Sequence, residues 1–226
     1  MNKLFFLTIL LTSILSLGQN HSIEDKIIEN ICKDLKNNNG KHDTVKIADA
    51  FEKHLDPYLK KWGEEKADSI SYSIFIRTQK DCYEFKEMLD RIYSIEDDEI
   101  IYFDKPQQSV ITDEELEDFK STKYFYYLIN FEVTYLILEE NQWFEFFEDK
   151  TYSKNIFKWD DRTKFTLTFV DSSNEQKKAL SREGEQYHYE IISKEKDWYW
   201  VQPLKTYSGK SLNFKLYKMV KDEENE

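Results

Sequence analysis

Glycine and proline are scarce in this sequence, with five glycines and three prolines among 226 residues. No two glycines lie within six residues of each other, which excludes the glycine-rich loops that bind dinucleotides or nucleotide phosphates. The low count also argues against collagen repeats and flexible linkers. The serine-hydrolase elbow and the His-Glu-x-x-His zinc motif are absent as well. We therefore expect no catalytic site, no cofactor and no metal site. A pair of carboxylates for glycoside hydrolysis is the alternative that the sequence leaves open, because Asp and Glu are numerous.

Positive charge is also in short supply. The chain has 32 Lys and Arg against 44 Asp and Glu, a formal net charge of -12. Phosphate recognition needs clustered basic side chains, so the composition argues against a nucleic-acid partner and against an anionic membrane surface. Hydrophobic residues make up 40% and aromatic residues 16%, which is enough for one or two packed domains.

The first residues have the pattern of a secretory signal peptide over 1–18. Lys3 precedes an apolar run from Leu4 to Leu17, and the small residues Ser16 and Gly18 follow at its end. A membrane anchor is the alternative, but the run is short for a hydrocarbon core of about 30 Å and contains Ser and Thr. We expect cleavage after Gly18, export to the periplasm or the medium, and no stable membrane anchor afterwards.

The two cysteines, Cys32 and Cys82, each lie on the apolar stripe of an expected helix. An exported chain with an even number of cysteines favours a disulfide between them. Two buried free thiols are the alternative. Neither cysteine is in a CxxC pair or beside a basic cluster, so neither is expected to be reactive.

Residues 19–93 are expected to be helical. Apolar residues recur at helical spacing in a first helix that Ser22 can cap, and a second helix begins near Asp43 and breaks near Pro57. A third helix is expected from about Ser71 to Tyr93, although Ser69 to Phe75 also alternate and could be extended.

An acidic connector is expected over 94–120, where ten acidic residues face two lysines. Thr112 and Glu115 have the spacing of a capping box, which predicts a short helix over 113–120. The acidity fits a solvated linker, and the alternative is a surface that docks a basic protein partner. A calcium site is another alternative for this segment, since oxygen-rich clusters bind hard cations, but the ordered calcium-binding loop is absent and no metal site is assigned.

From about 121 to 220 the hydrophobic period changes to two, which predicts an antiparallel β-meander closing into a barrel or sandwich. Glu140 and Asn141 are expected to form a two-residue hairpin turn. A disordered acidic tail is expected over 221–226. The expected strands cover residues 123–129, 132–139, 142–147, 153–159, 164–170, 186–193, 197–204 and 212–218.

Two stretches carry a family resemblance: Phe119-Lys120-Ser121-Thr122-Lys123-Tyr124-Phe125-Tyr126-Tyr127-Leu128 and Lys154 through Phe169. With Gln142-Trp143 between them and Ser16-Leu17-Gly18-Gln19 at the signal-peptide exit, they resemble a family of small exported β-domain proteins of Bacteroidetes. Ile76 through Phe85 is similar to helical segments that precede such domains. Thr122 and Arg162 depart from the Gly and Cys of the family pattern. The resemblance implies an α+β protein with a lipocalin-like barrel or half-barrel, and it brings no activity.

Four tryptophans are candidate ligand contacts: Trp143, Trp159, Trp198 and Trp200. In a strand, Trp198 and Trp200 face one side, where they could stack on a sugar ring or line an apolar pocket. The competing interpretation is that these rings fill the barrel core. The leading hypothesis is an exported, non-catalytic module that binds a small apolar molecule or a glycan. The alternative is an inhibitor or immunity-type protein that uses its acidic surface.

Overall fold

The computed structural model describes residues 23–37, 40–93, 99–129, 132–206 and 210–219. The chain divides into two compact units, Met1–Ser94 and Ile95–Glu226. The first unit is helical and the second is an antiparallel β-barrel, so the expected α+β class is confirmed. The expected signal peptide at 1–18 and the acidic tail at 221–226 lie outside the described residues.

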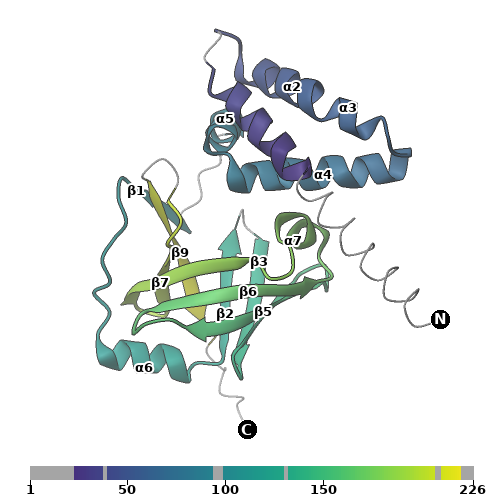
Figure 1. The fold of residues 1–226 in the computed structure, drawn as a ribbon. Helices are drawn as coiled ribbons and strands as arrows, with labels where there is room; N and C mark the ends of the chain where they lie inside the picture. Colours follow the sequence, from purple (N-terminus) through teal and green to yellow (C-terminus); the bar gives the residue numbers. More distant parts are fainter. Residues whose placement is uncertain (1–22, 38–39, 94–98, 130–131, 207–209, 220–226) are drawn as a thin grey trace, which may run out of the picture. The chain divides into compact units, whose positions relative to one another are not determined.

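The helical unit packs its helices around one apolar core, in which Ile31, Ile74 and Phe85 are completely buried. The rings of Phe51 and Phe75 lie 5.4 and 5.3 Å from the ring of Phe85. Helical spacing directs these side chains to one stripe of each helix, as the sequence pattern predicts. The helices are an N-terminal one over residues 23–35, then α2 (Asp43–His54), α3 (Asp56–Leu59), α4 (Glu64–Asp81) and α5 (Tyr83–Tyr93) (Figure 1).

Two helix boundaries differ from the sequence prediction. The helix expected from about Ser71 begins at Glu64, so the stretch that could have been extended is helical. That helix also ends at Asp81, because Cys82 has extended backbone angles of φ -120° and ψ 106°. The expected break near Pro57 is present at Leu55, and Pro57 lies in the first turn of α3, where its missing N–H costs no helical hydrogen bond.

The second unit is an eight-stranded barrel in which each strand pairs antiparallel with its neighbour in sequence. Strand β9 closes the barrel, since it pairs with β8 along one edge and with β2 along the other. Glu140 and Asn141 have φ values of 48° and 62°, as a type I′ hairpin turn requires. The strands are β2 (Tyr124–Ile129), β3 (Glu132–Glu139), β4 (Gln142–Phe147), β5 (Tyr152–Trp159), β6 (Lys164–Ser172), β7 (Gln186–Glu195), β8 (Trp198–Pro203) and β9 (Ser211–Lys218).

One further strand, β1 (Ile100–Phe103), lies in the segment that the sequence presents as a connector. It pairs with the first half of β9, with Ile100 opposite Phe214. From β1 the chain runs along the barrel wall, where the amide of Val110 donates to the carbonyl of Ile192 at 2.8 Å. The described part of the connector is therefore an integral piece of the barrel unit.

Helix α6 (Asp113–Ser121) follows this segment and covers one end of the barrel (Figure 1). The expected capping box between Thr112 and Glu115 is present. Phe119 projects from α6 into the barrel, where its ring lies 5.1 Å from Phe125 and 5.0 Å from Tyr199, and all three side chains are completely buried. We call this the closed end. Helix α7 (Glu175–Leu180) lies at the other end, which we call the open end.

Candidate functional site

The candidate site is inside the open end of the barrel, and the side-chain alternation of β2 and β4 builds its polar wall. Tyr127 projects inward from β2, and Trp143 and Glu145 project inward from β4. All three are buried, with exposed fractions of 5%, 2% and 7%. A carboxylate is therefore held among aromatic rings, in a position where most barrels carry an apolar side chain.

The opposite wall is apolar and comes from β6, β7 and β9. Phe165 and Tyr189 stack with ring centroids 5.3 Å apart, and Phe214 lies 6.2 Å from Tyr189. Together with the polar wall these side chains line a partly open pocket of about 250 Å³, which we call the inner cavity. Ile100 of β1 and Leu212 of β9 line it as well. The barrel interior thus packs buried aromatic rings at its closed end and has a pocket at its open end.

Glu145 is satisfied by three neighbours. The hydroxyl of Tyr127 donates to Oε1 at 2.7 Å, and the indole N–H of Trp143 donates to the same oxygen at 3.3 Å. The ammonium of Lys177, which reaches in from α7, lies 3.3 Å from Oε2. The Lys177 ammonium also donates to the Tyr127 hydroxyl at 3.4 Å. Pairing and hydrogen bonding together make burial of this carboxylate tolerable.

The two phenols of the site stay neutral. Burial raises the pKa of Tyr127 well above its ordinary value, and the neighbouring Glu145 raises it further. Burial likewise raises the pKa of Tyr189, with a smaller contribution from Glu145. Both hydroxyls therefore remain hydrogen-bond donors over the physiological range.

A second cavity of about 440 Å³ lies between α7 and the ends of β2, β3 and β4. We call it the outer cavity. It shares Tyr127, Ile129 and Lys177 with the inner cavity, so these side chains form the partition between the two spaces. Its other charged residues are Glu132, Glu148 and Asp149.

Helix α7 is anchored so that Lys177 points at the partition. The side chain of Asn174 caps the helix by accepting from the amide of Lys177 at 3.1 Å. The amide group of Asn174 in turn donates to the Thr151 hydroxyl at 2.9 Å. This places Lys177 in the first turn of a short helix that is tied to the loop between β4 and β5.

The four candidate tryptophans are not brought together. Trp143 lines the inner cavity. Trp159 is half-buried near the closed end, 6.0 Å from Phe119 of α6. Trp198 and Trp200 share one side of β8, as the alternation predicts, but that side is the outside of the barrel, because Tyr199 and Val201 between and beside them are completely buried.

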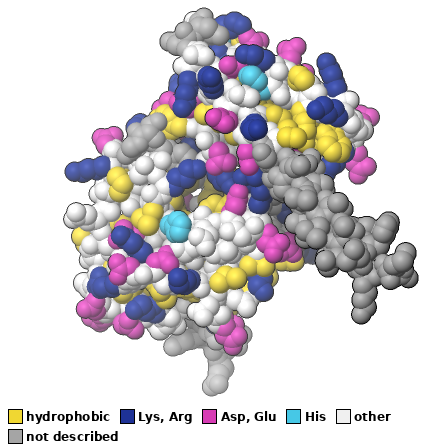
Figure 2. Space-filling view, in the orientation of Figure 1, with side chains coloured by type: hydrophobic (Ala, Val, Ile, Leu, Met, Phe, Trp, Pro, Cys, Tyr) yellow, Lys and Arg dark blue, Asp and Glu magenta, His cyan; other side chains and the backbone are white. Residues whose placement is uncertain are grey.

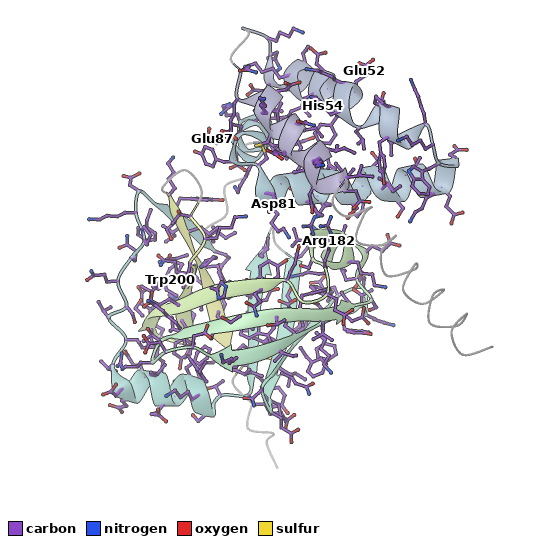
Figure 3. The ribbon with its side chains drawn as sticks, in the orientation of Figure 1. Glu52, His54, Asp81, Glu87, Arg182 and Trp200 are labelled. Atoms are coloured by element: carbon purple, nitrogen blue, oxygen red, sulfur yellow. A yellow bond between two sulfur atoms is a disulfide. The ribbon has the colours of Figure 1, made fainter. Side chains whose placement is uncertain are left out.

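The outer tryptophans of β8 lie beside charged side chains, and Trp200 is labelled in Figure 3. The indole N–H of Trp200 donates to Glu195 at 3.1 Å, and the ammonium of Lys215 lies 5.5 Å from the Trp198 ring and 5.7 Å from the Trp200 ring. The N–H of Trp198 is buried without a hydrogen-bond partner in the described structure. These rings form a cation–π cluster on the barrel wall, outside both cavities.

Cys32 and Cys82 form a disulfide, with Cα atoms 5.5 Å apart, in the helical unit (Figure 3). The bond joins the helix over residues 23–35 to the residue between α4 and α5. Glu84 Oε2 lies 3.3 Å from the sulfur of Cys32. These three residues are close enough to resemble a metal-ligand group, but sulfurs joined in a disulfide offer no thiolate.

Several carboxylates of the acidic connector form ion pairs or hydrogen bonds within the barrel unit. Asp113 pairs with Arg162 at 2.6 Å, and Asp118 pairs with Lys194 at 2.7 Å. Glu99 accepts from the Tyr217 hydroxyl at 2.7 Å. On the face of the barrel shown in Figure 2, acidic and basic side chains are interspersed instead of forming one acidic patch.

Four residues of the site were not predicted from the sequence: Tyr127, Glu145, Lys177 and Tyr189. Glu145 had a usable signal, since it lies between Trp143 and Phe147 on the inward side of an alternating strand. Lys177 had none, because it lies in what the sequence presents as a long polar loop.

Fold and site together define a closed antiparallel barrel with a mostly apolar interior pocket, in which the buried Glu145 pairs with the partly exposed Lys177. Comparison with protein-family models, with curated proteins and with solved structures finds no match for this chain. The resemblance to exported Bacteroidetes β-domain proteins therefore stays an expectation. Among the described helices, none combines the length and the apolar character needed to span a membrane.

Proposed function

We propose that this protein is an exported binding module whose barrel holds a small, mainly apolar molecule in the inner cavity. The observation that carries the proposal is the contrast between the two ends of the barrel interior. Phe119, Phe125 and Tyr199 pack against one another and are completely buried at the closed end, whereas the open end keeps about 250 Å³ of space. Protein interiors are normally close-packed, so a space of this size beside ordered polar groups is typical of a binding site.

The size and lining of the cavity limit the ligand. Pockets for drug-sized ligands measure about 300–1,000 Å³, so the occupant of this cavity is smaller than a typical drug. Aromatic and aliphatic side chains dominate the lining, and Glu145, Lys177 and two phenols supply the polar groups. An apolar molecule with one polar end fits this lining better than a glycan, which needs hydrogen-bonding groups along its whole length.

The disulfide supports the export part of the proposal. Disulfides persist in the periplasm and outside the cell and are rare in the cytosol. The Cys32–Cys82 bond therefore agrees with the signal-peptide pattern at 1–18. The alternative function, docking of a basic protein on the acidic connector, has less support, because Asp113 and Asp118 already have cationic partners within the barrel unit.

Filling the cavity tests the binding function. We would titrate the full chain with the uncharged probe N-phenyl-1-naphthylamine, whose fluorescence rises in apolar surroundings. Leu167 is buried and lines the inner cavity. Leu167→Trp should weaken saturable probe binding at least about tenfold, since the added ring takes up the space.

The matched control is Ile156→Trp, at a residue that is 50% exposed on the outside of β5. It should leave binding unchanged. Leu212→Trp fills the cavity from a second lining residue and repeats the test in case Leu167→Trp does not fold. Circular dichroism shows whether each variant is folded. Absence of saturable binding, or equal binding by Leu167→Trp and the control, would contradict the proposal.

A further inference from the structure

The ammonium of Lys177 already occupies the polar end of the site. It lies 3.3 Å from Glu145 Oε2 and 3.4 Å from the Tyr127 hydroxyl, and it lies 5.4 Å from the centroid of the Phe147 ring. A carboxylate, a phenol and an aromatic face are the groups that recognise an organic ammonium ion. Lys177 thus occupies the site as a tethered cation would.

Lys177 is carried by the short surface helix α7, whereas the carboxylate of Glu145 is held in place by strand β4 and its neighbours. The Lys177 side chain is 27% exposed and the Glu145 side chain is 9% exposed. Tyr127 and Trp143 hold Glu145 Oε1 from the rigid strands β2 and β4 and leave Oε2 to the ammonium. Of the two charged partners, Lys177 is therefore the one that can move, toward the outer cavity that it also lines.

Only a cation can replace Lys177 without leaving a buried charge uncompensated. If a neutral or anionic molecule displaced the ammonium, the carboxylate of Glu145 would lose its cationic partner inside a mostly apolar pocket, which is unfavourable. If an organic ammonium ion displaced it, the contacts of Glu145 and Tyr127 would be restored.

The outer cavity favours the same charge. Glu132, Glu148 and Asp149 line it, and Lys177 is the basic residue among its lining residues. Glu148 accepts from the amide of Val133, and Asp149 accepts from the amide of Thr151 at 2.9 Å. Hydrogen bonds from Thr151 hold the pKa of Asp149 below its ordinary value, so it stays anionic. These carboxylates attract an incoming cation and offer the displaced Lys177 new partners.

We propose that the ligand is a small organic cation, a primary amine carrying an aryl or short alkyl group, whose ammonium replaces Lys177 at Glu145 while its apolar part fills the inner cavity. The inference rests on the proposed binding function and specifies the chemical class of the ligand. The site binds the amine by exchanging one ammonium ion for another, and no net charge is buried.

Three matched probes test the inference: 2-phenylethylamine, 2-phenylethanol and 3-phenylpropionate, titrated calorimetrically into the full chain at neutral pH. They share one ring and differ in charge. The amine should bind at least about tenfold more tightly than the alcohol, and the carboxylate most weakly, because only the amine compensates Glu145. In Glu145→Gln the amine should lose its advantage over the alcohol, because the carboxylate that favours the ammonium is gone.

Lys177→Met supplies an independent measurement, since it removes the competing ammonium. Amine affinity should then rise several-fold, and Lys178→Met, an exposed neighbour on the same helix, should produce no such rise. Equal binding of alcohol and amine, or tightest binding of the carboxylate, would overturn the amine assignment and leave the cavity function standing. If none of the three probes binds saturably, and the naphthyl probe also fails, both proposals fall.

Discussion

Glu145 shows how a single residue gives the barrel its chemical character. A strand that alternates aromatic residues on one face normally builds an apolar core, and Glu145 interrupts that face between Trp143 and Phe147. The buried carboxylate requires a cation and hydrogen-bond donors around it, and Lys177, Tyr127 and Trp143 provide them. The alternation of inward and outward side chains along β4 is enough to predict that Glu145 points inward. The position of its partner Lys177 could not be predicted in this way, because it is set by how the segment between β6 and β7 folds.

Asp118 of α6 holds two lysines and a phenol at the closed end of the barrel. Lys194 and Lys218 donate to it at 2.7 and 2.5 Å, and the Tyr199 hydroxyl donates at 2.5 Å. Partial burial acts to raise the pKa of Asp118, but these hydrogen bonds outweigh burial and hold the pKa well below its ordinary value. Asp118→Asn should therefore lower the free energy of unfolding by about 1–2 kcal/mol at neutral pH, a figure discounted for partial exposure.

The sign of the pH dependence follows from the lowered pKa. Stability from Asp118 is fully present above the unfolded-state value of about 3.9 and is lost as the pH falls toward the folded-state value. Urea denaturation should show the difference between the wild type and Asp118→Asn shrinking between neutral pH and about pH 2.5. Asp104→Asn, at an exposed residue, is the control and should change little. A difference that grows in acid would contradict this assignment.

The tryptophans mark the limit of prediction at single residues. The alternation of side chains along a strand correctly predicts that Trp198 and Trp200 lie on the same side of β8. It does not predict which side faces the barrel interior, because both sides carry large apolar residues. Which side faces inward is decided by the pairing of Tyr199 with Leu216 and of Val201 with Phe214, and these partners lie far along the chain.

At the level of elements, the strands were predictable and the helix boundaries less so. All eight barrel strands follow from alternation and turn residues, and their bounds differ from the expected ones by at most two residues. The break at Cys82 was not predictable, because the apolar stripe continues through it from Phe75 to Phe85. Strand β1 was missed because four residues within an acidic segment give a weak signal.

Helix α6 covers the closed end of the barrel and contacts its interior through the side chain of Phe119. Its side chain is completely buried against Phe125 and Tyr199. Phe119→Ala should lower the free energy of unfolding of the barrel by about 3–5 kcal/mol, because the lost ring leaves a cavity. The matched control is Phe146→Ala, at a residue that is 41% exposed, and it should cost less than about 1 kcal/mol. Equal costs in urea denaturation would show that α6 does not support the barrel.

The disulfide is the corresponding constraint in the helical unit. It spans a sequence separation of 50, for which loop entropy gives about 4 kcal/mol of stabilisation. Reduction, or the double change of Cys32 and Cys82 to Ser, should therefore accelerate amide hydrogen exchange in residues 23–93 of the full chain. Exchange in the barrel strands should stay as it is, since the two cores share no residues. Equal acceleration in both units would contradict this separation.

At the scale of the whole molecule, each of the two units has its own hydrophobic core, and the two cores share no residues. The helical unit has a hydrophobic core cross-linked by the disulfide, whereas the barrel carries an ion pair and a cavity at one end of its interior. The net charge of -12 is consistent with a chain that attracts cations and repels anions at long range. The binding function that we propose therefore belongs to the barrel unit, at its open end.

Methyl NMR of the leucine-labelled full chain, titrated with 2-phenylethanol and 2-phenylethylamine, tests the central claim most directly. Leu167 and Leu212 line the inner cavity, whereas Leu136 and Leu216 are completely buried elsewhere in the barrel core. Saturable shifts of the Leu167 and Leu212 methyl signals, with Leu136 and Leu216 nearly unchanged, are the predicted result. Shifts confined to other leucines, or no saturable shift with either compound, would contradict the assignment of the cavity as a binding site.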